Sequence, residues 1–345
     1  MNWRRTRVRV AAMVSAAMLA ALALTACGSS DDKSSGGGSK SDKPLRIAHF
    51  VGLAANTYNQ ASVKGADAAA AKQGNVKVQV FSADLDPNRQ IQQIQTAAAS
   101  GQYDAFVVQT VNGVTVVPAI KQAAAKGITI TCAFAVCGPD QSSFSRQMDE
   151  LASQSGINAG RLGTQAAPVV GEACRGKSPC NLVIMAGVPG LGTEKPYLDN
   201  LKAGLKRFPN VKVVATGLGG YLAEPSYKAM KDILQAHSDV DAVVGLGDQM
   251  IVGSEQALRE AGKSGVALIG DGASEIAVKA IREGRWYGSS ILRPYNDGYV
   301  AMTNAIKAAR GEQVPPLVDS EASPEIPGGV ITSDNVDKWK PEWAG

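Results

Sequence analysis

The sequence is poor in the residues that most often carry enzymatic chemistry. It contains two histidines, His49 and His237, and aromatic side chains make up 5% of its residues. It has no Gly-x-Ser-x-Gly nucleophile elbow, no Walker phosphate-binding sequence and no His-Glu-x-x-His zinc motif. Without these signatures of hydrolases, nucleotidases and metalloproteases, we expect no catalytic residue set, no cofactor and no bound metal.

Long runs of one charge are also missing. The chain has 35 lysines and arginines against 31 aspartates and glutamates, and four of its arginines fall within the first nine residues. A basic stripe or pI above 9 is typical of nucleic-acid binding, and neither occurs here. We therefore expect no nucleic-acid partner.

The first 30 residues are typical of an export signal. A basic start is followed by an apolar run over 10–24 and then by Leu24-Thr25-Ala26-Cys27-Gly28. About 15 apolar residues are too few to span a bilayer. The small residues before Cys27 resemble a bacterial lipobox, so we predict a signal peptide over 1–26 and lipidation of Cys27. An ordinary signal peptide with a chance cysteine is the alternative.

A polar stretch follows the predicted lipidation site. Residues 28–43 contain no apolar side chain, so they bury too little surface to offset the entropy of ordering. We predict a flexible tether over 27–43. The protein would be exported and attached through lipid to the outer face of the cell membrane, or be periplasmic.

The remaining cysteines form two close pairs, Cys132 with Cys137 and Cys174 with Cys180. Three connectivities are open to four cysteines. In an oxidising compartment, pairing within each short loop costs the least chain entropy, so we predict two local disulfides. A metal site is disfavoured because neither pair has Cys-x-x-Cys spacing and both histidines lie far away in the sequence. A redox-active pair is the third possibility.

The exported part has about 300 residues, which suits two domains better than one. Short β-branched or aliphatic runs alternate with helical stretches, a pattern typical of parallel sheets covered on both faces. We therefore predict an α/β fold with two doubly wound parallel-sheet lobes, and a ligand site at the carboxyl ends of the strands. Strands are expected at 45–50, 76–81, 105–108, 128–133, 182–185, 211–216, 242–246, 266–269 and 288–291. Helices are expected at 58–73, 88–100, 114–126, 198–207, 227–236, 254–261, 274–283 and 297–310.

A glycine-rich segment and two carboxylates follow predicted strands. The glycine-rich segment 187–193 suggests a phosphate cradle, but it lacks the consecutive lysine and serine or threonine of a P-loop, and its proline removes one amide donor. We interpret it as a turn that lines a cleft. Asp248 and Asp271 each follow a strand, where a carboxylate suits a hydroxyl ligand. Paired carboxylates for glycosidic chemistry stay open as an alternative.

Several short segments together resemble a known family. They are Asn56-Thr57-Tyr58-Asn59, Asp86-Pro87, Gly247-Asp248-Gln249-Met250 and Ile269-Gly270-Asp271-Gly272. By their order and spacing, residues 44–335 resemble the periplasmic solute-binding proteins of the ribose and galactose type, which capture ligands for bacterial ABC importers. Sugar-responsive repressors share the fold, but they begin with a helix-turn-helix where this chain has its predicted signal.

The resemblance implies two lobes joined by three crossings, near 150–151, 292–293 and 318–321. The amino-terminal lobe would contain 44–150 plus 293–318, and the carboxyl-terminal lobe with its tail 151–292 plus 319–345. The lobes of a monomer would close around a small solute by hinge motion and deliver it to an ABC permease and its ATPase, without reaction.

The resemblance also implies ligand-binding residues. Asn56, Tyr58, Asn59, Asp248 and Asp271 occupy family positions, although Asn59 replaces an aromatic residue and Gly247 replaces an asparagine.

Other positions depart from the family. Phe134 stands where Asp-Arg is common, and Leu201 and Leu292 stand where an arginine and a glutamine are expected. Each lost donor would leave a sugar hydroxyl unpaired at about 1–3 kcal/mol. We therefore expect a sugar-like or polyol-like solute that is less hydroxylated or partly apolar.

Other residues near these positions are further candidates for ligand contact. Phe134 and Tyr58 would pack against the solute, with Trp286 or Tyr295 as further candidates and Trp286 favoured as a packing residue. Arg293 would meet a ligand carboxylate or form a hinge salt bridge, and both readings are open. The alternatives to transport are a lipoprotein that presents its ligand to a membrane sensor, and a secreted enzyme on the same fold.

Overall fold

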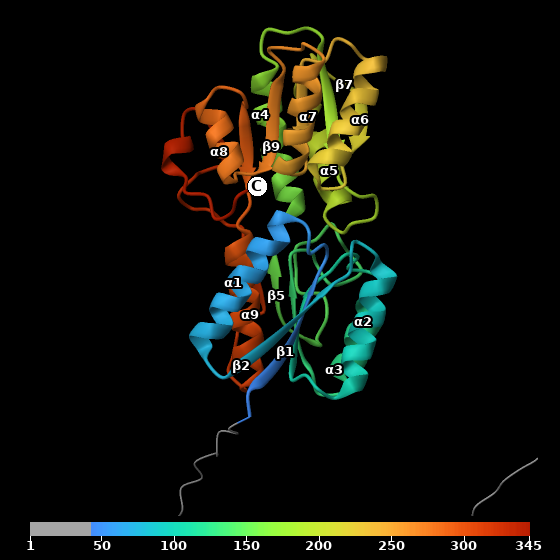
Figure 1. The fold of residues 1–345 in the computed structure, drawn as a ribbon, viewed down its shortest axis with the longest axis vertical. Coiled ribbons are helices and arrows are strands. Elements are labelled where there is room, and N and C mark those ends of the chain that lie inside the picture. The colour runs from blue at the N-terminus through green and yellow to red at the C-terminus, as the bar shows by residue number, and fades with distance from the viewer. Residues whose placement is uncertain (1–42) are drawn as a thin grey trace, which may run out of the picture. The chain divides into compact units, whose positions relative to one another are not determined.

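The computed structural model describes residues 43–345, which form one compact unit. The predicted signal peptide, Cys27 and all of the predicted tether except Lys43 lie outside the described residues. Within the described range, no helix has the length and apolar character needed to cross a membrane. The described chain folds into two lobes, each built on its own sheet (Figure 1).

The first lobe contains a six-stranded parallel sheet with helices on both faces. Alternate residues of its strands point to opposite faces, so α1 and α9 cover one face and α2 and α3 cover the other. The strands run in the order β11-β5-β4-β3-β1-β2. They are β1 (Leu45–Val51), β2 (Val76–Ser82), β3 (Ala105–Gln109), β4 (Thr129–Ala133), β5 (Leu151–Gly156) and β11 (Leu317–Asp319), and the helices are α1 (Thr57–Gln73), α2 (Pro87–Ser100), α3 (Val117–Ala124) and α9 (Pro294–Ala309).

The second lobe repeats this plan with one difference. Its six strands run in the order β12-β10-β9-β8-β6-β7, and β12 alone is antiparallel to its neighbour. The strands are β6 (Cys180–Ala186), β7 (Val211–Leu218), β8 (Ala242–Gly245), β9 (Ala267–Gly272), β10 (Gly288–Ile291) and β12 (Val330–Thr332). The helices are α4 (Ala159–Ala173), α5 (Glu194–Leu205), α6 (Ala223–Ala236), α7 (Asp248–Glu260), α8 (Glu275–Arg282) and the short 3-10 turn η1 (Val336–Lys338). The predicted fold of two doubly wound lobes is confirmed.

Local sequence explains where the helices next to the lobe junction begin. The Asn56 side chain accepts hydrogen bonds from the backbone amides of Tyr58 and Asn59, and so caps α1. Asp86 caps α2 in the same way, with Pro87 at the first helical position. These caps fix the residues that follow β1 and β2 at the edge of the first sheet.

Five elements were not predicted from the sequence: β5, α4, the short strands β11 and β12, and the turn η1. β5 reads Leu-Ala-Ser-Gln-Ser-Gly, which lacks the apolar character of a buried strand, yet it is almost wholly buried. Its polar side chains find backbone partners: Ser153 donates to Pro315 O at 2.8 Å, and Gln154 donates to Ala135 O at 3.2 Å. α4 contains three glycines and Pro168, which weaken its helical pattern.

The position of β5 corrects the predicted lobe boundary. Because β5 pairs with β4 and β11 in the first sheet, the chain leaves the first lobe after Gly156 and not between Glu150 and Leu151. The second passage lies between β10 and α9, and the third between β11 and β12.

Both predicted disulfides are present. Cys132 is bonded to Cys137 at the end of β4, and Cys174 is bonded to Cys180 between α4 and β6. All four cysteines are fully buried. The first disulfide closes the loop that carries Phe134.

α1 and α9 pack so closely that glycine is required at their contact. A Cβ atom on Gly65 would lie 2.0 Å from Tyr295 O, and one on Gly298 would lie 1.9 Å from Ser62 O. Either clash is with backbone, which cannot rotate away. The contact joins the start of the first lobe to the segment that returns to it from the second.

We predict that Gly65→Ala lowers the melting midpoint, because overpacking of about 1–3 kcal/mol exceeds the helix-propensity gain of about 1 kcal/mol. Gly160→Ala in α4 is the control, since the nearest atoms to its Cβ belong to side chains, the closest being Asn200 Nδ2 at 3.1 Å. Thermal melting followed by circular dichroism checks this. Equal midpoints for the two variants would contradict the close packing described.

A candidate ligand-binding cavity between the lobes

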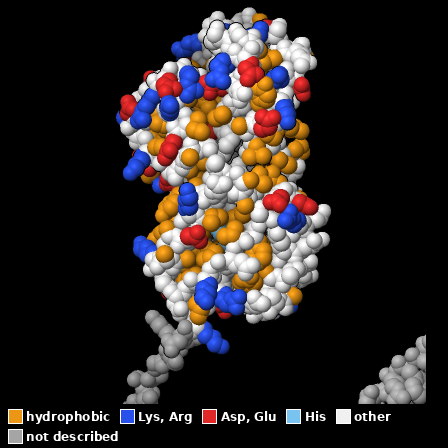
Figure 2. Space-filling model, viewed as in Figure 1, with side chains coloured by type: hydrophobic (Ala, Val, Ile, Leu, Met, Phe, Trp, Pro, Cys, Tyr) orange, Lys and Arg blue, Asp and Glu red, His pale blue; other side chains and the backbone are white. Residues whose placement is uncertain are grey.

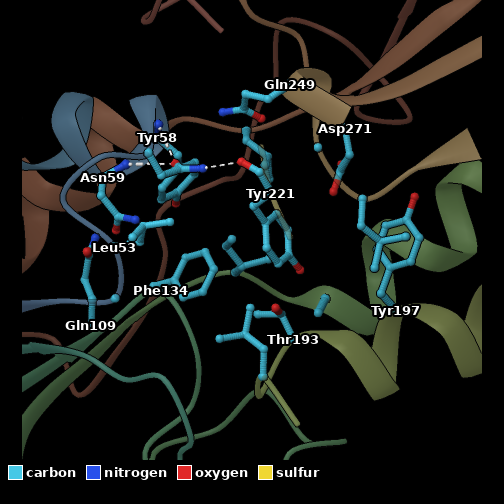
Figure 3. Close-up of a pocket in the computed structure, with 18 of the residues that line it drawn as sticks. Leu53, Tyr58, Asn59, Gln109, Phe134, Thr193, Tyr197, Tyr221, Gln249 and Asp271 are labelled. Carbon is cyan, nitrogen blue, oxygen red and sulfur yellow. Dashed lines mark hydrogen bonds between the residues drawn. The ribbon is translucent and has the colours of Figure 1, made fainter. Parts of the chain in front are cut away.

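A cavity lies at the junction of the lobes, where the carboxyl ends of strands from both sheets meet (Figure 3). About 70 Å³ of it is accessible to the centre of a water molecule. Figure 2 shows hydrophobic side chains gathered on both lobes near this junction. The residues that line it are Gly52, Leu53, Asn56, Tyr58, Asn59, Leu85, Gln109, Thr110, Phe134, Ile157, Ala159, Leu162, Leu191, Thr193, Tyr197, Tyr221, Leu246, Gly247, Gln249, Asp271, Leu292 and Trp343.

Aromatic rings form a large part of the wall. The Tyr58 ring packs edge to face on Phe134, with 5.3 Å between ring centroids, and on Trp343, with 5.9 Å. The Tyr58 hydroxyl donates to Glu321 Oε1 at 2.8 Å, so the side chain offers its ring to the cavity while its hydroxyl is engaged. Phe134 has a φ of +66°, a left-handed conformation that is uncommon outside glycine and directs the backbone at the end of β4.

Four buried polar atoms around the cavity have no hydrogen-bond partner within the described chain. Gln109 Oε1 and Thr110 Oγ1 belong to the first lobe, and Tyr197 Oη and Asp271 Oδ1 belong to the second. The four residues are at most 4% exposed. Buried polar atoms nearly always have partners, so these four mark places where a ligand's polar groups can bind. Figure 3 shows Gln109 on one side of the cavity and Tyr197 with Asp271 on the other.

Asp271 is the most perturbed of these groups. Burial, and then the nearby charge of Asp248, raise the pKa of Asp271 well above its ordinary value. A raised pKa favours the protonated carboxyl group, which can both donate a hydrogen bond and accept one. A hydroxyl group of a ligand can form either of these bonds.

Of the predicted ligand-binding residues, Asn56, Tyr58, Asn59, Phe134 and Asp271 line the cavity. Leu292, one of the positions that depart from the family, also lines the cavity. Leu201, another such position, is buried in the core of the second lobe.

The structure corrects the prediction for Asp248. This residue is fully buried behind the cavity wall at the start of α7. Its carboxylate accepts from Ser289 Oγ at 2.8 Å and from Ser274 N at 2.9 Å, so it joins the ends of three segments of the second lobe. Asp248 therefore holds together the segments around Asp271 and does not line the cavity.

The structure also corrects the prediction that Arg293 binds the ligand. Arg293 Nε donates to Glu342 Oε1 at 2.9 Å and Arg293 Nη1 donates to Ala322 O at 3.0 Å, so the hinge salt bridge is the reading that holds. Neither of the two further aromatic candidates lines the cavity. Trp286 is buried and donates to Glu255, and Tyr295 is partly exposed and stacks on Tyr299.

The glycine-rich segment 187–193 is a turn that lines the cavity. Leu191 and Thr193 contribute to the wall. The backbone amides of Gly187 and Val188 donate to Glu194 Oε1 at 3.0 and 3.2 Å, so these two donors are already used and do not face a phosphate. The same oxygen accepts from the Tyr221 hydroxyl, which holds Tyr221 against the cavity.

The lobes contact each other beside the cavity. Asn56 Nδ2 donates to Tyr221 O at 2.9 Å, and Gln249 Nε2 donates to Thr57 Oγ1 at 2.8 Å. A second contact lies near the β3–α3 loop, where Asn112 Nδ2 donates to Gly190 O at 3.1 Å. These bonds cross between lobes, so in this arrangement the lobes are closed over the cavity.

Buried acids gather where the chain passes between the lobes. Asp297 accepts from Ser320 Oγ at 2.7 Å, and Glu321 accepts from Tyr58 Oη and from the amide of Arg293. Burial raises the pKa of Asp297 to about 6, and burial and then the charge of Asp297 raise that of Glu321 well above its ordinary value.

Sequence reasoning missed much of the second-lobe wall. Gln109 follows a predicted strand, so strand-end position was an available signal for it. Tyr197 lies one turn inside α5, Tyr221 lies in a loop and Trp343 lies in an irregular segment, so no local pattern marked these three.

Two similar sheets that enclose a cavity at their strand ends, joined by three chain passages, define a two-lobed ligand-binding protein. A family model described as periplasmic binding protein domain matches residues 47–313. The chain therefore belongs to the periplasmic binding protein family, and the resemblance inferred from the sequence is confirmed.

Individual relatives agree with this assignment. The chain is 25% identical over 325 residues to the xylitol-binding protein of Mycolicibacterium smegmatis, covering 94% of this chain and 86% of the relative. A solved ABC transporter solute-binding protein of Mycobacterium smegmatis with bound glycerol has a TM-score of 0.75 at 24% identity, covering 88% of this chain and 99% of that one. A Bacillus halodurans solute-binding protein with bound myo-inositol gives 0.75 at 20% identity, over 87% and 98%. These structures support the fold.

We predict that Asp297 makes stability depend on pH. Its folded pKa of about 6 exceeds the ordinary 3.8. Its stabilising contribution is therefore complete below pH 3.8 and is lost as pH rises through about 6. Asp297→Asn keeps a neutral group, so its melting midpoint should fall less than that of the unmodified protein between pH 4 and pH 7.

The exposed variant Asp149→Asn is the control, and it should keep the slope of the unmodified protein. Melting midpoints of the three proteins, measured at half-unit pH steps, test this pH dependence. Parallel curves for Asp297→Asn and the unmodified protein would show that Asp297 does not titrate in this range.

Proposed function

We propose that this protein is the extracytoplasmic solute-binding component of an ABC importer, and that it captures a small polyol or polyol-like sugar by closure of its lobes. No reaction takes place on the solute. The two histidines of the chain are absent from the cavity lining: His49 is buried in β1, where burial lowers its pKa to about 4, and His237 follows α6.

The unpartnered polar atoms on opposite lobes are the observation that carries this proposal. A solute that bonds Gln109 and Thr110 in the first lobe, and Tyr197 and Asp271 in the second, stabilises only the arrangement in which both lobes reach it. Hydroxyl groups suit these atoms because each can donate and accept. The aromatic wall of Tyr58, Phe134 and Trp343 suits the C–H faces between hydroxyls.

The size of the cavity favours a small solute. A water-sized sphere occupies about 10–15 Å³, so a cavity with about 70 Å³ open to the centres of water molecules holds several waters. Bonded atoms pack more closely than waters, and a chain of a few carbons with their hydroxyls fits this space.

The relatives support the same class of solute. The relative from Mycolicibacterium smegmatis is named for xylitol binding, and the two solved structures contain glycerol and myo-inositol. All three ligands are polyols.

Export and anchoring form a further part of the proposal. We infer that lipid on Cys27 attaches the protein outside the cell membrane, and that residues 27–43 give the described domain reach towards its permease. A ligand-presenting sensor would use the same cavity. A permease and an ATPase encoded beside the gene would favour transport.

The ligand class is tested by a thermal-shift screen with xylitol, glycerol, ribose, myo-inositol and small organic acids. A ligand at about 100 times its dissociation constant adds about 2.7 kcal/mol of stability. We expect a polyol to raise the melting midpoint, and Asp271→Ala to abolish that rise. A shift with acids alone, or with none of the compounds, would contradict the proposal.

Two tyrosine variants locate the bound solute. The Tyr197 hydroxyl has no partner in the described chain, so Tyr197→Phe should leave the ligand-free midpoint unchanged while it weakens polyol binding about tenfold. The Tyr221 hydroxyl is bonded to Glu194, so Tyr221→Phe should lower the ligand-free midpoint. Calorimetric titration with xylitol measures the binding. Unaltered affinity in Tyr197→Phe would place the solute elsewhere.

A further inference from the structure

The last residues of the described chain, Trp339–Gly345, lie against the cavity and the hinge, and no family-matched motif of the sequence includes them. We call residues 339–345 the closing segment. Trp343 in this segment lines the cavity and is 5% exposed.

Backbone and indole groups attach the closing segment to the second lobe. Trp343 Nε1 donates to Gly272 O at 3.0 Å, and Trp339 Nε1 donates to Ala273 O at 2.7 Å. The carbonyls of Trp343 and Ala344 accept from the first amides of α8, those of Glu275 and Ile276, at 3.0 and 3.1 Å. The segment therefore satisfies amides at a helix start that would otherwise lack partners.

Glu342 attaches the same segment to the hinge and the first lobe. Its Oε1 pairs with Arg293 Nε at 2.9 Å, and its Oε2 accepts from the amide of Asn296, in the first turn of α9, at 3.1 Å. Both charged side chains are less than a quarter exposed, which strengthens the pair relative to one on the surface. The closing segment thus spans the second passage between the lobes.

Trp343 sits between the polar and the apolar parts of the cavity. It is bonded to the residue after Asp271, and its ring packs on Tyr58 from the opposite lobe. Its only donor is already used by Gly272, so it presents apolar ring surface to a solute. A Cβ on Gly272 would lie 2.7 Å from Trp343 Cζ2, so the ring has no room to withdraw in that direction.

We propose that Trp343 determines the size and shape of the solute that the cavity accepts, and that Glu342 keeps it in place through Arg293. This inference rests on the proposed function as a polyol-binding protein. The ring supports the C–H face of a solute whose hydroxyl is bound by Asp271. It also closes the space that a longer solute would need.

The test compares xylitol with the longer polyol sorbitol, by calorimetric titration of the full exported chain. Trp343→Phe should weaken xylitol binding about tenfold and sorbitol binding less, so the ratio of the two dissociation constants changes. Trp343→Ala, which opens more space, should move that ratio further towards sorbitol.

Trp339→Phe is the matched control. Trp339 lies in the same segment, is equally buried at 5% exposure and makes the same kind of indole bond, but it does not line the cavity. It should lower the melting midpoint about as much as Trp343→Phe and leave the ratio unchanged. Equal ratios in all variants, or the same change in both phenylalanine variants, would overturn the inference and leave the proposed function standing.

Binding of neither polyol by the unmodified protein would instead contradict the proposed function. The role of Trp343 is then decided by amide hydrogen exchange of the ligand-free protein. Trp343→Phe should speed exchange over residues 56–60, at the start of the helix that carries Tyr58, and Trp339→Phe should not. Equal exchange in the two variants would overturn the role of Trp343 on its own.

Discussion

The arrangement of the lobes depends on one buried carboxyl group, that of Glu321. It lies in the third passage between the lobes, accepts from the Tyr58 hydroxyl at the cavity wall, and accepts from the amide of Arg293 in the second passage. Water is excluded from this site, since Glu321 is 1% exposed. A buried carboxylate without a cation is costly, and burial together with the charge of Asp297 raises the pKa of Glu321 well above its ordinary value. The hinge and the wall of the cavity thereby share one hydrogen-bonded group.

Through such bonds, the aromatic wall of the cavity is connected to the hinge. Tyr58 offers its ring to a solute while its hydroxyl is bound at the hinge, and Trp343 offers its ring while its neighbour Glu342 binds Arg293. A solute that contacts Tyr58 or Trp343 is therefore connected to the chain passages between the lobes through one or two side chains. Under the proposed function, a bound solute supplies the energy difference between open and closed arrangements, because only in the closed one can it bond the unpartnered atoms of both lobes at once.

Sequence patterns predicted the fold well and the site in part. Alternating apolar strands and helical stretches identified both lobes. The polar strand β5 and the glycine-containing helix α4 were missed, because their stability comes from tertiary partners such as Pro315 O. Asp271 was placed through its position after a strand. The same reasoning misplaced Asp248, which follows β8 equally well but turns inwards to Ser274 and Ser289. Trp343 reaches the cavity only through the folded closing segment, which no local period reveals.

The central claim is that the lobes close around a small polyol, and the distance between them tests it most directly. Spin labels at the exposed positions 126 and 202, one in each lobe, report that distance by double electron–electron resonance. The account predicts a broad distribution without ligand and a single narrow population with saturating xylitol. An identical distribution in both samples, in a protein whose melting midpoint rises with xylitol, would contradict closure as the means of capture.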